Sequence, residues 1–402
     1  SVSDILSVSF LQKEAKIKDK LRVVPLFETL DDLINAKPVM ENLFSKKWYR
    51  KLINNKQEVM IGYSDSSKDA GKICASWHQY KAQEEIVKLG KKFNIDVTFF
   101  HGRGGSPGRG GGPIQATLRS QPPNSVNGKI RITDQGEVIQ QKYGYEPIAE
   151  YNLCSYIGAV TEATLNPPPV PKQNWRELIE KMADISKSSY RKNINQSSEF
   201  IKYFKTVTPS AALGKLSIGS RPAKRKNIDN IKSLRAIPWV FAWTQIRLML
   251  PAWLGSAEAL RYGYIKKFRK TLIDMEKNWP FFNSMLDILD MVITKVDPEV
   301  SKIYEAYLAD KTLKRVGKKL RFQFDAIKTL NKKITPKEII LTRKQFRTLI
   351  MVRAIYSEVL NIIQPIVMSK LNKNKKISEK KYLNDALLTS IAGISAAMKN
   401  TG

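Results

Sequence analysis

The chain has 402 residues, 42% of them hydrophobic, which is enough to bury a large core in one or two domains. Its net charge of +31 suits nucleic acid, but the lysines are scattered and no homeodomain, zinc-finger or RNP signature is present, so we expect a solvated basic surface and no nucleic-acid partner. Two cysteines exclude a disulfide framework and favour a reducing compartment, the cytoplasm.

Four runs rich in β-branched and aromatic residues predict strands at residues 22–28, 58–64, 95–100 and 129–134. Thr29, followed by Asp31 and Asp32, supplies an N-cap and an acidic first turn for a helix after the first strand. Repeated β–α units with apolar strands of this length predict a parallel sheet that is covered by helices.

The chain changes character at the proline run of residues 166–171. We therefore divide it into residues 1–165, which carry the strands, and residues 166–402, which are mostly helical, and expect both parts to form one continuous catalytic domain. Helical periodicity predicts long helices at residues 256–275, 285–296, 342–371 and 387–398. The polar residues 369–381 predict an exposed loop.

The aromatic residues Trp239, Phe241, Trp243 and Trp253 are expected to lie in the core rather than around a cofactor. They fall within residues 236–255, the most apolar stretch, where two prolines, a glutamine and an arginine argue against a membrane-spanning helix. His78 lies well along a predicted helix, away from any strand end, and is expected to be structural or on the surface.

Residues 101–113 read HGRGGSPGRGGGP and hold seven of the chain's 21 glycines, together with Arg103 and Arg109. Glycine is concentrated in this way where the backbone must adopt positive φ or approach a ligand closely. A strand precedes the segment and a helix is expected to start at Pro113, so the layout predicts an anion-binding loop. A flexible surface loop and an RGG-type RNA-binding tract are the alternatives.

Charged residues stand where three predicted strands end: Glu28 after the first, Asp65 after the second and His101 after the third. In a parallel α/β barrel, ligands collect at the carboxyl ends of the strands. Two carboxylates there suit Mg²⁺ or Mn²⁺, and Lys68 would neutralise an anion beside the metal. Taken singly, Glu28 also fits an ordinary helix-start acid and Asp65 an ordinary turn residue.

Two further basic clusters contain Arg221 and Arg235, each next to rigid or apolar residues. Arginines in such surroundings are often held in place, although the pattern alone also fits surface arginines.

Seven stretches resemble the phosphoenolpyruvate carboxylase family, and the resemblance runs from end to end of the chain. They are VPLFETLDDL at residues 24–33, VMIGYSDSSKDAG at 59–71, FHGRGGSPGRGGGP at 100–113, LRSQPP at 118–123, GSRPAKR at 219–225, SLRAIPWVFAWTQIRLMLPAWLG at 233–255 and the terminal MKNTG. Several of these motifs are long and rarely met elsewhere.

The resemblance implies a helix-rich (β/α)8 barrel with extensive additional α-helices, of which this chain would be the C-terminal portion, and a homotetramer for the full-length protein. It implies a reaction in which phosphoenolpyruvate and bicarbonate form oxaloacetate and phosphate, with Mg²⁺ or Mn²⁺ and without biotin. In that reaction bicarbonate attacks the phosphoryl group, giving carboxyphosphate and the enolate of pyruvate, and the enolate then captures CO₂.

The resemblance also implies roles for individual residues. The metal ligands would be Glu28 and Asp65. The substrate phosphate would be held by Arg103, Arg221 and Arg235. The remaining catalytic groups would be His101 beside the reacting centre, Lys68 on the anionic reactants and Arg109 on a mobile glycine-rich loop. Aspartate or malate, as inhibitor, would be bound by Arg109, Lys295, Arg353 and Asn400.

One departure from the family is expected to matter. The family carries an N-terminal portion with a His-Pro-Thr segment, whose histidine acts as catalytic base, and a further phosphate-binding arginine, and neither has a counterpart in this sequence. We therefore expect a C-terminal part of a longer polypeptide, with little or no carboxylase activity alone. The alternative is a non-catalytic half-chain that binds dicarboxylate or phosphate ligands and needs a partner chain for chemistry.

Overall fold

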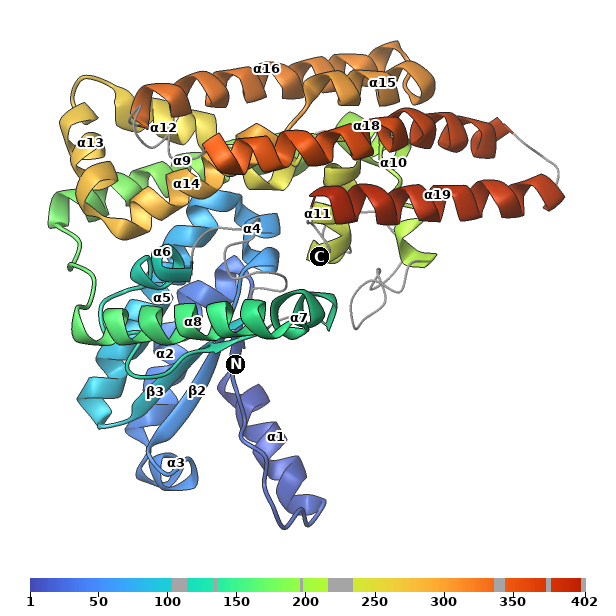
Figure 1. The fold of residues 1–402 in the computed structure, drawn as a ribbon. Helices are drawn as coiled ribbons and strands as arrows, with labels where there is room; N and C mark the ends of the chain where they lie inside the picture. Colours follow the sequence, from blue (N-terminus) through green and yellow to red (C-terminus); the bar gives the residue numbers. More distant parts are fainter. Residues whose placement is uncertain are drawn as a thin grey trace. The chain divides into compact units, whose positions relative to one another are not determined.

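The computed structural model describes residues 1–102, 114–133, 136–195, 198–215, 234–335, 344–373 and 377–398. The chain forms two compact units (Figure 1). The first unit comprises Ser1–Ser66, Ala75–Arg176 and Lys277–Ser284, and the second comprises Ser67–Cys74, Glu177–Glu276 and Met285–Gly402.

The first unit contains a four-stranded sheet in the order β1-β2-β3-β4, in which all neighbouring strands are parallel. Its strands are β1 (Leu26–Phe27), β2 (Lys56–Gly62), β3 (Asp96–Gly102) and β4 (Arg131–Ile132). The predicted strands and their parallel arrangement are confirmed. The described residues hold four strands, so closure into an eight-stranded barrel stays a prediction.

Strand β1 is shorter than the predicted 22–28. Pro25 has no N–H to donate to a neighbouring strand, although its carbonyl accepts a hydrogen bond from the Met60 N–H at 2.8 Å. Before it, the carbonyl of Val23 accepts from the side chain of Gln57 at 3.1 Å instead of from a strand. Regular pairing therefore begins at Leu26, opposite Met60.

Helices connect and flank these strands (Figure 1), and the first of them extends away from the sheet. Up to residue 165 they are α1 (Val2–Glu14), α2 (Leu30–Ser45), α3 (Lys47–Leu52), α4 (Ser64–Ala70), α5 (Lys72–Phe93), α6 (Ile114–Arg119), α7 (Gly136–Tyr143) and α8 (Glu146–Leu165). The predicted cap of α2 is confirmed, because Thr29 and Asp32 form a reciprocal capping box. One core joins α2, β2, α5 and β3 through buried residues such as Met40, Val59, Ile86 and Phe99.

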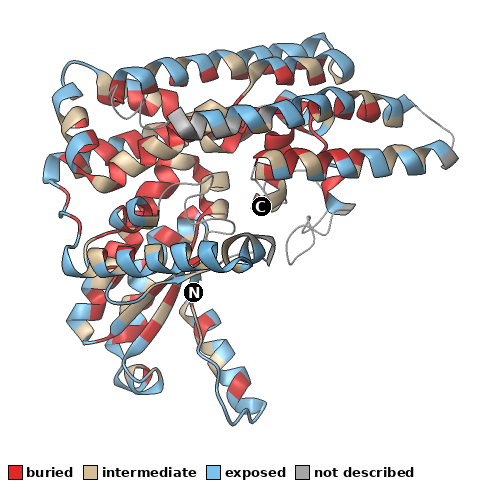
Figure 2. Cartoon of the chain, viewed as in Figure 1, coloured by how far each residue is buried: buried red, intermediate tan, exposed pale blue. Residues whose placement is uncertain are grey.

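From residue 173 onward the chain is helical wherever regular structure is described. The elements are α9 (Gln173–Asn195), α10 (Ser198–Val207), η1 (Leu213–Lys215), α11 (Ala236–Gln245), η3 (Leu250–Ala252), α12 (Ser256–Tyr264), α13 (Arg269–Asn278), α14 (Pro280–Lys295), α15 (Pro298–Leu308), α16 (Lys311–Ile334), α18 (Lys344–Lys373) and α19 (Ile377–Met398). Buried and exposed faces alternate along α16 in Figure 2, as in an amphipathic helix. None of the described helices is both long and apolar enough to span a lipid bilayer.

The aromatic residues of the 236–255 stretch are in the core, as predicted. Trp239, Phe241, Trp243 and Trp253 are each at most 2% exposed. The ring of Trp243 stacks on Tyr203 of α10, with ring centroids 6.2 Å apart. His78 is also buried, in α5.

Two predictions in the second half, one of a helix and one of a loop, are wrong. The predicted helix 256–275 is two helices, α12 and α13, which fold back so that Leu272 lies against Gly263; a Cβ at position 263 would be 2.9 Å from Leu272 Cδ1. The predicted loop 369–381 is helical at both ends, because α18 continues to Lys373 and α19 begins at Ile377. Lysine and glutamate are good helix formers, and no glycine or proline interrupts this stretch.

A buried ion pair joins α15 and α16. The carboxylate of Glu305 is paired with the guanidinium of Arg321 and accepts a hydrogen bond from the Tyr203 hydroxyl at 2.8 Å. Burial raises the pKa of Tyr203 well above its usual value, and the neighbouring Glu305 raises it further. Gly317 makes room for this carboxylate, since a Cβ there would be 1.8 Å from Glu305 Oε1.

We predict that Gly317→Ala destabilises the protein by about 3 kcal/mol, because the new methyl group would displace a carboxylate whose partners are themselves buried. Urea unfolding would measure the change. The control is Gly158→Ala on the exposed face of α8, where a Cβ meets nothing within 4 Å and alanine should stabilise by about 0.5–1 kcal/mol. Equal stabilities for the two variants would contradict the prediction.

Candidate active site

Two carboxylates follow the ends of neighbouring strands. Glu28 comes directly after β1, and Asp65 lies in the first turn of α4, three residues after the end of β2. A Cβ on Gly62 would be only 2.4 Å from Glu28 Cβ, so Glu28 packs directly against the end of β2. Glu28 and Asp65 thus each follow the carboxyl end of one of two neighbouring parallel strands, and their joint role as metal ligands stays a prediction.

These two residues fit a hard divalent cation. Carboxylate oxygens are the ligands that Mg²⁺ prefers, and such ions usually take one or two protein carboxylates and keep several positions for water and substrate phosphate. Among the described residues no group of three or more His, Cys, Asp or Glu side chains is placed to hold a metal ion.

His101, the next-to-last residue of β3, is 3% exposed, and its Nδ1 is 2.7 Å from the hydroxyl of Tyr63. Tyr63 is a site residue that the sequence analysis missed. The register of the strands brings the two side chains together: Ile61 of β2 pairs with His101 of β3, and Tyr63 lies two residues after Ile61 in the chain. A phenol donates readily and a neutral imidazole accepts at one nitrogen, so we expect Nδ1 to accept and Nε2 to carry the proton.

The turn between β2 and α4 is held by a second pair that sequence reasoning did not identify. The Ser66 hydroxyl lies 3.3 Å from both the Gly62 and the Tyr63 carbonyl oxygens and accepts from Gln79 Nε2 at 2.8 Å. Ser66 and Gln79 are buried. This network fixes the backbone that presents Asp65 on one side and Tyr63 on the other.

In the second unit, two of the predicted cations come together. Lys68 donates a hydrogen bond to the carbonyl of Leu234, the residue before Arg235. Arg235 occupies the N-cap position of α11 and is half-buried. Its Nε is buried and has no hydrogen-bond partner among the residues that the structure describes. An unsatisfied buried donor on a guanidinium is expected to bind an acceptor such as a phosphate oxygen.

The predicted inhibitor residues lie partly within the described structure. Lys295 ends α14, and its Nζ donates to the Met398 carbonyl at 3.3 Å. Arg353 is half-buried on α18. The other predicted site residues lie outside the described residues: Arg103, Arg109, Arg221 and Asn400.

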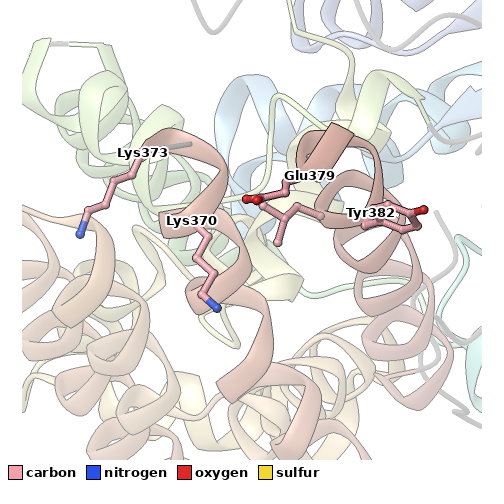
Figure 3. A pocket seen from close by; sticks show the side chains of 5 residues that line it. Lys370, Lys373, Glu379 and Tyr382 are labelled. Carbon is pink, nitrogen blue, oxygen red and sulfur yellow. The ribbon is translucent and has the colours of Figure 1, made fainter. Parts of the chain in front are cut away.

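A pocket lies at the far end of the α18–α19 pair, where α18 ends and α19 begins. Its lining residues are Lys370, Lys373, Glu379, Tyr382 and Leu383. In Figure 3 the two lysines extend away from Glu379, and Tyr382 points away from both of them. The polar groups do not converge on a common point, so this pocket is not a candidate site.

Comparison with known proteins places the chain next to one family. The family model described as phosphoenolpyruvate carboxylase matches residues 1–402. The chain is 47% identical to the phosphoenolpyruvate carboxylase of Marinomonas sp. strain MWYL1 over 401 residues, 48% identical to that of Acinetobacter baylyi over 404 residues and 46% identical to that of Escherichia coli O157:H7 over 403 residues. Each alignment covers 100% of this chain and 45% or 46% of the relative, so the chain spans less than half the length of the curated relatives that it matches.

The tautomer of His101 can be measured directly, because the chain has only two histidines. We predict that ¹⁵N imidazole spectra show the proton of His101 on Nε2, and that Tyr63→Phe shifts the Nδ1 resonance toward that of an unbonded nitrogen. His78→Gln assigns the spectrum by removing the other ring. A proton on Nδ1 in the unmodified chain, or an unchanged spectrum in Tyr63→Phe, would contradict the assignment.

Proposed function

Because the chain belongs to the phosphoenolpyruvate carboxylase family, we propose that it carries the metal-binding and phosphate-binding residues of such an enzyme and takes part in forming oxaloacetate and phosphate from phosphoenolpyruvate and bicarbonate. The observation that carries this proposal is that Glu28 and Asp65 follow the ends of neighbouring parallel strands in a chain that matches the family over its whole length.

Glu28 and Asp65 would hold Mg²⁺ or Mn²⁺. When bound there, the ion would neutralise charge on phosphate oxygens, and phosphoryl transfer depends largely on such neutralisation and on positioning. The glycine at position 62 supports this assignment, because it removes the one side chain that would separate Glu28 from the end of β2.

The substrate phosphate would be held by Arg103, Arg221 and Arg235, and Lys68 would help to hold or polarise the anionic reactants. The buried Nε of Arg235 lacks a partner among the described residues and is available as one arm of a bidentate fork to phosphate. The bond from Lys68 to the Leu234 carbonyl places a second positive charge next to the backbone that carries Arg235.

His101 would act as a hydrogen-bond donor to an oxygen that gains charge during the reaction. With Nδ1 bonded to Tyr63, the neutral ring presents its Nε2 proton in a fixed direction. Bicarbonate oxygen attacks phosphorus and the enolate of pyruvate leaves; the resulting carboxyphosphate then releases CO₂, which the enolate carbon captures. Arg109, on the glycine-rich segment, would close over these intermediates and exclude water.

Regulation would use a second group of residues. Lys295, Arg353 and Asn400, together with Arg109, would bind aspartate or malate, and an inhibitor that captures Arg109 would withdraw it from catalysis. The full-length protein would be a cytoplasmic homotetramer.

A half-chain that binds dicarboxylate or phosphate ligands without catalysing the reaction, and needs a partner chain for chemistry, is the second candidate. Isothermal titrations with aspartate and with phosphoenolpyruvate, beside a coupled oxaloacetate assay, separate the two. We predict that both ligands bind and that oxaloacetate formation by the chain alone is absent or very slow. Turnover at an ordinary enzyme rate of about 10 s⁻¹ would overturn the second candidate, and absence of binding by both ligands would overturn both candidates.

The metal site can be tested without activity. Paramagnetic Mn²⁺ should broaden the amide resonances of Glu28 and Asp65 selectively, and Glu28→Gln or Asp65→Asn should reduce this effect roughly tenfold or more, because each removes a charged ligand. Gly62→Ala should act in the same way by displacing Glu28, while Gly158→Ala should leave the broadening unchanged. Uniform broadening in all variants would exclude a metal site at this edge.

A further inference from the structure

Arg247 is a buried arginine with a strained backbone, and it has no role in the proposed mechanism. It follows α11, is 3% exposed and has a φ of +56°, in the left-handed region that side chains other than glycine seldom adopt. The turn is fixed by backbone hydrogen bonds, among them that from the Arg247 N–H to the Thr244 carbonyl at 3.0 Å. Strained residues of this kind persist only where surrounding structure holds them, and they cluster at functional sites.

The residue holds the junction between α14 and α15 at two points. Its Nε donates to the carbonyl of Lys295 at 3.0 Å, and its own carbonyl accepts from the N–H of Asp297 at 2.9 Å. The two bonds lie on either side of Val296. They fix the main chain from which the Lys295 side chain extends.

The same guanidinium reaches α18. Its Nη1 donates to the hydroxyl of Ser357 at 3.2 Å, and Ser357 is fully buried. Ser357 lies four residues after Arg353, so the two side chains are neighbours on the same face of the helix. Arg247 therefore joins the segment that carries Lys295 to the helical turn that carries Arg353.

Burial of this charge is costly, and packing alone does not account for it. Burial lowers the pKa of Arg247, while the carboxylates of Asp297 and Glu358 oppose that change. The described side-chain hydrogen bonds of Arg247 go to neutral acceptors, a carbonyl and a hydroxyl, which compensate a buried charge less well than a carboxylate does. A side chain of similar length without charge would fill the same space at lower cost, but it could not bond to both elements at once.

We propose that Arg247 is a positioning residue for the dicarboxylate site: it fixes the spacing between the Lys295 main chain and the Arg353 turn, so that both cations meet one ligand. This inference rests on the inhibitor site proposed above. A ligand that binds a prearranged pair of cations does not have to order them, and a site with fixed spacing therefore binds more tightly.

The test is isothermal titration of aspartate into the 402-residue chain and its variants, with the melting temperature measured alongside. Ser357→Ala removes only the α18 acceptor, and Arg247→Lys keeps the charge but cannot bond to both elements. We expect each to weaken aspartate binding roughly tenfold. If Arg247→Lys does not fold, Ser357→Ala carries the test.

Matched controls separate positioning from stability. Ser186→Ala removes another fully buried serine of the second unit, and Arg321→Lys removes another arginine fork, whose side chain is 13% exposed, so both should change the melting temperature without changing aspartate affinity. Unchanged affinity in folded Ser357→Ala and Arg247→Lys would overturn the inference, and so would an equal loss in the two controls. If the unmodified chain does not bind aspartate, the inhibitor site itself is wrong and the positioning role falls with it.

Discussion

The close approach of Glu28 to Gly62 is the constraint on which the candidate site depends. Parallel strands β1 and β2 end side by side, and the chain leaves each of them toward a helix. A side chain at position 62 would push the segment after β1 away from the end of β2, since a Cβ there would be 2.4 Å from Glu28 Cβ. With glycine at position 62, Glu28, directly after β1, and Asp65, three residues after β2, can both follow the same edge of the sheet.

The turn after Gly62 also determines where the next candidate site residues of the first unit lie. The side chains of Ser66 and Gln79 donate to the Gly62 carbonyl, and Ser66 lies within hydrogen-bond distance of the Tyr63 carbonyl as well, so these two buried residues have partners for their carbonyl oxygens. The same turn carries Tyr63 toward His101 on the next strand. One turn thus positions Asp65 and also orients His101 through Tyr63. Candidate site residues that are held in this way have a defined geometry.

Sequence alone predicted what depends on local chemistry or on strand ends. The four strands, the Thr29 cap, the buried tryptophans near residue 240 and the placement of Glu28 and Asp65 after the ends of neighbouring strands follow from propensity, periodicity and the rule for parallel sheets. It did not predict the Tyr63–His101 bond, which depends on strand register, or the contacts of Arg247, whose partners lie 48 and 110 residues away. The loop expected at 369–381 failed for another reason: polarity was taken as a sign of irregular structure, whereas lysine and glutamate favour helix.

Two arginines near α11 illustrate how one residue type serves opposite purposes. Arg235, at the start of the helix, keeps a buried Nε without a partner among the described residues, and Arg247, just after its end, donates to the backbone of one element and the hydroxyl of another. An unsatisfied donor is tolerated where a ligand will supply the acceptor, while a satisfied one stabilises a fixed arrangement whether or not a ligand is present. The net charge of +31 gives no hint of this difference, because it counts every lysine and arginine alike. The burial of each guanidinium and the identity of its hydrogen-bond acceptors distinguish Arg235, which would bind substrate, from Arg247, which joins secondary-structure elements.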